Sequence, residues 1–170
     1  ADWKARRTLL CFGAVDYHAT VWVNGRYAGE HEGGGTPFKL DVTPLLKAAG
    51  NTVTVRAFDP PTDRAIPRGK QYWEPKSRSI FYTRTTGIWQ TVWLEPVPEM
   101  RLGRPRITPD VSRGLFHLQV PVVGAQPGAE LGAALFAAHG IITKSVCRLG
   151  LDLNLSLDLP IPEDQRRLWS

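Results

Sequence analysis

Apolar and polar residues alternate along much of the first half of the chain. Ala19–Val23 and Thr52–Phe58 carry apolar side chains at every second position, as a strand with one buried face does. Leu9–Val15 is an apolar run that also predicts a strand. Asn24-Gly25 predicts a tight hairpin turn, because both residues tolerate positive φ, and Arg26–Glu32 then returns as the partner strand.

Glycine, threonine and proline set the next boundaries. The triple glycine Gly33–Gly35 predicts a flexible corner, after which Thr36–Val42 resumes the sheet. Thr43-Pro44, followed by an apolar segment to Ala48, predicts a short helix with Thr43 as its N-cap and Gly50 as its stop.

The segment from Thr83 to Glu95 bends at Gly87 and then alternates, which predicts a strand over Ile88–Pro96. The alternation places Trp89, Thr91, Trp93 and Glu95 on one face, and Ile88, Gln90, Val92 and Leu94 on the other. We expect Trp89 and Trp93, together with Trp22, to lie in the core, with indole N–H groups that need acceptors.

Residues 59–84 form an irregular connection, much longer than usual, and such loops are functional or disordered. Four aromatic side chains favour order: Tyr72, Trp73, Phe81 and Tyr82. Positive charge is concentrated within residues 60–84, where Arg64, Arg68, Lys70, Lys76, Arg78 and Arg84 face only Asp63 and Glu74. Two interpretations stay open: the cations attract an anion, such as a uronic acid, a sulfated sugar or nucleic acid, or the arginines tie the loop to the sheet by bonding carbonyls.

The second half contains four strand candidates with glycine or proline at their ends: Leu115–Val123, Ala129–Ala138, Ile141–Leu149 and Leu151–Leu159. Their spacing suits a small immunoglobulin-like sandwich. Pro96-Val-Pro98 and the arginines up to Arg106 predict a linker. The expected fold class is therefore all-β, with one β-sandwich over residues 1–98 and a second over residues 99–170.

Composition narrows the function classes. The chain has 170 residues and a formal net charge of +5, and its longest apolar runs fall short of the about 20 residues of a membrane span. Cys11 and Cys147 lie far apart and show no zinc-like spacing with a histidine, so we expect neither a disulfide nor a metal site. Phosphate-loop, zincin and nucleophile-elbow motifs are absent from the sequence.

Three blocks together resemble the N-terminal sugar-binding domain of glycoside hydrolase family 2, the β-galactosidase and β-glucuronidase family. They are Phe12-Gly-Ala-Val-Asp-Tyr-His-Ala-Thr-Val-Trp-Val-Asn-Gly-Arg26, Gly29-Glu-His-Glu-Gly-Gly-Gly-Thr-Pro-Phe-Lys-Leu-Asp41 and Thr83-Arg-Thr-Thr-Gly-Ile-Trp-Gln-Thr-Val-Trp-Leu-Glu95. The resemblance implies a jelly-roll (galactose-binding-like) β-sandwich followed by an immunoglobulin-like one. It also implies that the first domain lacks its first strands and that the second, which closes on residues 167–170, lacks its last.

Catalysis in this family resides on a (β/α)₈ barrel, where one glutamate donates a proton and another attacks the anomeric carbon. A barrel needs about 250 residues, so we expect no catalytic residue in this chain and no activity from it alone. The resemblance implies a non-catalytic N-terminal fragment of a β-glycosidase, which supports the barrel and lends loop residues to sugar binding. An independent carbohydrate-binding module is the alternative.

Substrate contact is expected from the sandwich edge. The residue at the position of Asp16 reaches the sugar pocket in relatives; otherwise Asp16 caps the turn before Tyr17. A second family position, usually aspartate, falls near Phe81, where a phenyl ring could stack on a sugar instead. The loop offers Lys70 and Gln71 as hydrogen-bonding groups, Arg68 as a cation, and Trp73 and Tyr82 as an aromatic platform, or else it only packs on the sheet.

The implied partners are carbohydrate and the catalytic barrel. No cofactor, metal, nucleic acid or membrane partner is expected, while a homo-oligomer stays open. The sequence leaves the compartment, the sugar and the linkage undetermined.

Overall fold

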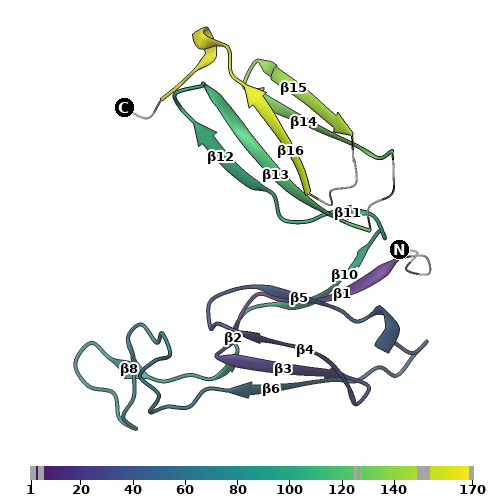
Figure 1. Ribbon diagram of the computed structural model, residues 1–170. Coiled ribbons are helices and arrows are strands. Elements are labelled where there is room, and N and C mark those ends of the chain that lie inside the picture. The colour runs from purple at the N-terminus through teal and green to yellow at the C-terminus, as the bar shows by residue number, and fades with distance from the viewer. Residues whose placement is uncertain (1–2, 4–5, 125, 127, 149–153, 169–170) are drawn as a thin grey trace. The chain divides into compact units, whose positions relative to one another are not determined.

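Strands and single 3₁₀ turns make up all the regular elements in the computed structural model, which describes residues 3, 6–124, 126, 128–148 and 154–168 (Figure 1). The predicted all-β fold class is confirmed. The chain divides into two compact units, Ala1–Val97 and Pro98–Ser170. Within the described residues, no helix has the length and hydropathy needed to cross a membrane.

Two antiparallel three-stranded sheets form the first unit, stacked one over the other (Figure 1). One sheet has the order β10-β1-β5, from Val92–Val97, Arg7–Phe12 and Phe38–Asp41. The other has the order β4-β3-β6, from Arg26–Glu32, His18–Val23 and Val53–Phe58. Their inner faces share one buried core of apolar side chains: Leu10, Phe12, Val15, Ala19, Val21, Val23 and Val42.

The hairpin between β3 and β4 forms where Asn24-Gly25 predicts it. Asn24 and Gly25 have φ values of 53° and 77°, which only small or Asx-type residues adopt without strain. The Asn24 side chain also holds the neighbouring loop: Nδ2 donates to the carbonyl of Leu45 at 2.9 Å, and Oδ1 accepts from the amide of Thr52 at 3.0 Å.

The helix predicted from Thr43 is a single 3₁₀ turn, η1, over Thr43–Leu45. Its N-cap residue is Val42, whereas the sequence predicts Thr43 at that position. The Thr43 hydroxyl donates to Asp41 Oδ1 at 2.6 Å and accepts from the Thr8 amide at 2.9 Å, so it joins two strands instead of capping. Asn51 binds both the amide and the carbonyl of Lys47, which ends helical bonding after one turn.

The strand predicted over Ile88–Pro96 is interrupted. β9, Gly87–Ile88, pairs with β2, Val15–Asp16, whereas β10 pairs with β1. The expected burial of two tryptophans is wrong, because Trp89 is 59% exposed and Trp93 40% exposed. Trp89 lies in the break between the two strands, and Trp93 is the register partner of Cys11, outside the main core.

The loop at residues 59–84 is ordered, as its aromatic content predicts. It contains the short strands β7, Gln71–Tyr72, and β8, Tyr82–Thr83, which pair in parallel. In Figure 1 this segment extends beyond one end of the first unit's sheets.

The described residues of the second unit form six strands. β13, Leu115–Val123, pairs with β11, Arg101–Leu102, with β12, Arg106–Asp110, and with β16, Asn154–Pro160. β14, Glu130–Ala137, and β15, Gly140–Arg148, form a hairpin. The 3₁₀ turn η2 covers Glu163–Gln165. The core of this unit consists of Val120, Val122, Leu131, Leu155, Leu157 and Leu159.

All four strand candidates of the second half are present, but the predicted linker is wrong in part. β11 and β12 lie in or next to the arginine- and proline-rich stretch that sequence alone assigns to a linker. They carry few apolar residues, and their pairing with β13 is a tertiary contact that local sequence does not encode. The predicted ends at Leu149 and Leu151–Leu153, and the closing residues 169–170, lie outside the described residues.

A paired substitution tests the position of the main core. Leu10 on β1 and Leu94 on β10 are register partners, yet Leu10 is 3% exposed and Leu94 47%. Leu10→Ala should lower the free energy of unfolding by about 2–5 kcal/mol, because it opens a cavity. Leu94→Ala should change it by about 0.5 kcal/mol or less. Urea unfolding followed by tryptophan fluorescence measures both, and equal effects would contradict the assignment of the core.

Thiol reactivity tests the second face of β1. Burial and the hydrogen bond from Cys11 Sγ to Glu95 Oε2 (3.5 Å) raise the pKa of Cys11 to about 11. The reactive thiolate is then roughly one part in a thousand at pH 8. In the native protein, 5,5′-dithiobis(2-nitrobenzoate) should label the partly exposed Cys147 first, and both cysteines in urea. Rapid native labelling of the Cys147→Ser variant would contradict this arrangement.

Candidate functional site

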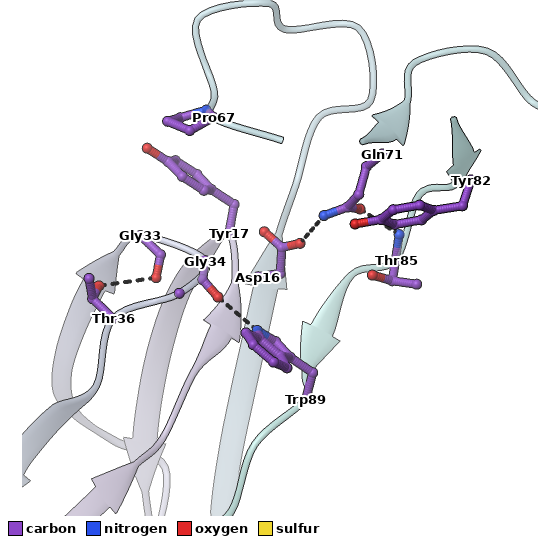
Figure 2. Close-up of a pocket in the computed structure, with 11 residues that line it drawn as sticks. Asp16, Tyr17, Gly33, Gly34, Thr36, Pro67, Gln71, Tyr82, Thr85 and Trp89 are labelled. Carbon is purple, nitrogen blue, oxygen red and sulfur yellow. Dashed lines mark hydrogen bonds between the residues drawn. The ribbon is translucent and has the colours of Figure 1, made fainter. Parts of the chain in front are cut away.

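Asp16 lies at the end of β2, where the chain leaves the main sheets and pairs with Gly87 of β9. Its side chain is buried, and the residue is 9% exposed. Gln71 Nε2 donates to Asp16 Oδ2 at 2.8 Å, and Gln71 Oε1 accepts from the Thr85 amide at 2.8 Å (Figure 2). One glutamine therefore fixes the carboxylate and joins two parts of the long loop.

The triple-glycine corner forms the other side of Asp16. A Cβ atom on Gly34 would lie 2.5 Å from Asp16 Oδ1, closer than atoms can approach. Trp89 Nε1 donates to the Gly34 carbonyl at 2.7 Å, so a hydrogen bond from the exposed indole holds this corner in place (Figure 2). Glycine is required at position 34 because the backbone passes directly against the carboxylate.

These groups surround a hollow of about 520 Å³, within the usual range for a small-ligand site. Figure 2 shows aromatic rings of Tyr17, Tyr82 and Trp89 around the Asp16 carboxylate. Tyr82 is 52% exposed, which leaves its ring accessible. We call this space the Asp16 hollow; its lining is Asp16, Tyr17, Gly33, Gly34, Gly35, Thr36, Pro67, Gln71, Tyr82, Thr85 and Trp89.

Three carboxylates act on the phenol of Tyr17, one of the residues that line the Asp16 hollow. Desolvation raises the pKa of Tyr17, and the negative charges of Glu32, Asp63 and Asp16, with a hydrogen bond to Glu32, raise it further. Carboxylates of the sheet, the loop and the hollow itself thus act on one phenol.

A second hollow, of about 420 Å³, lies within the loop. Arg68 lines it, but the Arg68 side chain is only 10% exposed. Its Nη2 atom lies 3.3 Å from Oδ1 of Asp59, and the Asp59 side chain is 2% exposed. Arg68 also donates to the carbonyls of Pro60 and Asp63. The second hollow is lined by Asp63, Arg64, Ile66, Arg68, Gly69, Gln71, Trp73 and Phe81.

The candidate residues therefore separate into three groups. Asp16, Gln71 and Tyr82 come together at the Asp16 hollow, and Arg68, Trp73 and Phe81 line the second hollow together with Gln71. Lys70 is exposed and lines neither hollow, while its carbonyl accepts from the Tyr82 amide at 3.0 Å. Trp73 and Phe81 pack with the buried Tyr72, with centroid distances of 4.6 Å from Tyr72 to Trp73 and 5.4 Å from Tyr72 to Phe81.

Sequence reasoning missed several members of the Asp16 hollow. The alternation predicts that Trp89 lies in the core. The signal against this was its indole N–H, which needs an acceptor and finds one in the Gly34 carbonyl. Gly34 was recognised as part of a corner but not as a contact of Asp16. Tyr17, Thr36, Pro67 and Thr85 gave no separate signal. Within the described part of the chain, His, Cys, Asp and Glu side chains form no group of three that could hold a metal ion.

Adjacent glycines provide a test of this geometry. Gly34→Ala should displace the Asp16 carboxylate and lower the free energy of unfolding by about 1–3 kcal/mol, as overpacking does. Gly35→Ala is the matched control, because a Cβ atom there meets nothing within 4 Å. It should shift the free energy by about 0.5 kcal/mol or less. Chemical denaturation measures both, and an undisturbed Gly34→Ala protein would contradict the contact.

Comparisons with known proteins agree with this architecture. The family model for "Glycosyl hydrolases family 2, sugar binding domain" matches residues 1–95. The β-glucuronidase of Rattus norvegicus is 30% identical over 136 residues, which are 71% of this chain and 21% of the relative. The β-galactosidase of Thermoanaerobacter pseudethanolicus is 33% identical over 95 residues, 55% of this chain and 12% of the relative.

Among solved structures, the β-glucuronidase of Bacteroides uniformis superposes with a TM-score of 0.70 at 25% identity, covering 99% of this chain and 21% of that chain. The chain spans about a fifth or less of the length of these relatives. Because the family model covers more than half of its residues, the chain belongs to glycosyl hydrolase family 2, as the sugar-binding domain and the segment that follows it.

Proposed function

We propose that the chain is the non-catalytic N-terminal part of a family 2 β-glycosidase, in which it supports a catalytic barrel and lends the Asp16 hollow to the sugar site. The observation that carries this proposal is the pre-positioned carboxylate. Asp16 is buried, its orientation is fixed by Gln71, and it lies beside accessible rings of Tyr82 and Trp89. Such a group costs free energy to bury and is well suited to bind hydroxyl donors.

The family comparisons support the parent's reaction class. The relatives described above are named β-glucuronidase and β-galactosidase, and both names describe hydrolysis of a β-glycosidic bond. In such an enzyme the two catalytic glutamates come from the barrel. The second unit, 98–170, would be the immunoglobulin-like sandwich between the sugar-binding domain and that barrel.

An independent carbohydrate-binding module is the second candidate. The exposure of Tyr82 and Trp89 beside Asp16 favours it, because open aromatic rings are the usual platforms for a sugar. The two functions differ in a simple measurement on the 170-residue chain. Titration calorimetry with a monosaccharide panel should detect millimolar or tighter binding for a module, and none for an accessory domain that supplies only part of a site.

The accessory role predicts a specific effect of Asp16. In the longer polypeptide that carries this chain and a barrel, Asp16→Ala should lower kcat/KM for the preferred 4-nitrophenyl β-glycoside by about 10–100-fold, as the loss of a charged hydrogen bond does. Asp110→Ala in the second unit removes a carboxylate far along the sequence and should leave kcat/KM within about twofold. The 170-residue chain alone should release no 4-nitrophenol.

Two results would count against the accessory role. Glycoside hydrolysis by the purified 170-residue chain, with contaminating enzymes excluded, would place a catalytic site within it. Equal kcat/KM for the wild-type enzyme and a correctly folded Asp16→Ala variant would remove Asp16 from the sugar site.

A further inference from the structure

The relatives of this chain act by name on both a uronide and a neutral glycoside, so the sugar class is open. The charge of the Asp16 hollow bears on that choice. Asp16 is the only residue with a formal charge among the eleven that line the hollow, all of them within the described residues. No lysine, arginine or histidine is present in this lining to pair with an anionic ligand.

Cations of the neighbouring loop do not change this balance. The Arg68 side chain is only 10% exposed, is paired with Asp59 and donates to two loop carbonyls. Arg64 lies over the ring of Trp73, 5.7 Å from its centroid, and lines the second hollow. Lys70 is exposed and lines neither hollow. None of these three cations lines the Asp16 hollow.

We propose that the Asp16 hollow accepts a neutral, hydroxylated sugar ring and rejects a uronic acid, so that the parent enzyme acts on neutral β-glycosides. This inference rests on the function proposed above, and names its substrate class. Sugar hydroxyls donate hydrogen bonds to the carboxylate of Asp16. Its Oδ2 atom already accepts one hydrogen bond from Gln71, and its Oδ1 atom faces Gly34. The apolar face of the ring packs against Tyr82 and Trp89.

A uronate meets two costs in the same place. A pyranose ring is shorter than the Debye length of about 8 Å, so its carboxylate is poorly screened from Asp16. It also loses water without gaining a cation from the lining residues, which leaves its desolvation uncompensated. The carboxylates of Glu32 and Asp63, which act on Tyr17 together with Asp16, add to the repulsion.

Matched substrate pairs test this directly in the barrel-bearing polypeptide. The 4-nitrophenyl β-galactoside and β-galacturonide, and the β-glucoside and β-glucuronide, differ only in the oxidation state of carbon 6. Within the pair that is hydrolysed faster, the wild-type enzyme should prefer the neutral glycoside over the uronide by at least about tenfold in kcat/KM. Asp16→Asn, which keeps the size and one acceptor, should reduce this preference by about tenfold.

Glu30→Gln is the matched charge control, because Glu30 lies on β4, is 58% exposed at its side chain and does not line the hollow. It should leave the preference unchanged. A wild-type measurement completes the test if Asp16→Asn does not fold. Galacturonate and glucuronate should inhibit at least about tenfold more weakly than galactose and glucose.

The outcomes separate this inference from the proposed function. A wild-type preference for the uronide, or a preference that Asp16→Asn leaves intact, overturns the inference. In either case, a large loss with Asp16→Ala still supports a sugar contact by this domain. If Asp16→Ala changes kcat/KM for neither member of a pair, both the inference and the proposed function are overturned.

Discussion

The bond between Gln71 and Asp16 is the contact on which the candidate site depends. A carboxylate that is nine-tenths buried is costly unless a donor meets it, and Gln71 supplies that donor at 2.8 Å. The same side chain accepts from the Thr85 amide, so both ends of its amide group are satisfied. One residue therefore sets the orientation of Asp16 and connects β7 to the segment that follows β8.

The contact between Gln71 and Asp16 is possible because β2 ends at Asp16, beside the buried core of the sandwich. Phe12 is fully buried, and so is Val15, the first residue of the two-residue strand β2, so Asp16 lies at the edge of the core. Gly34 and Trp89 then close the site from the opposite side. The interruption between β9 and β10 releases Trp89 from the sheet, where its indole N–H would otherwise need a partner in the core.

The long loop shows how a cluster of cations can serve structure instead of ligand binding. Arg68 forms a buried ion pair with Asp59, and Arg84 donates to the carbonyl of Trp73 at 3.2 Å. Both side chains order the loop, in agreement with the interpretation that arginines tie it down by bonding carbonyls. These contacts occupy two of the six loop cations that an anion could have bound, and the described lining of the Asp16 hollow contains no cation.

Sequence patterns alone determined the all-β class, the Asn24-Gly25 hairpin and four strands of the second unit, because local periodicity and turn chemistry encode them. The three motif blocks likewise determined the family, and with it the candidacy of Asp16. The short helix was predicted where one 3₁₀ turn forms, since the Thr43 hydroxyl bonds the amide of Thr8, 35 residues away in sequence, instead of capping a helix. Tertiary structure alone decided that Gln71, 55 residues from Asp16, is its partner and that Gly34 has no room for a side chain. No local pattern carries that information, because the contacts arise from folding a long loop against a sheet edge.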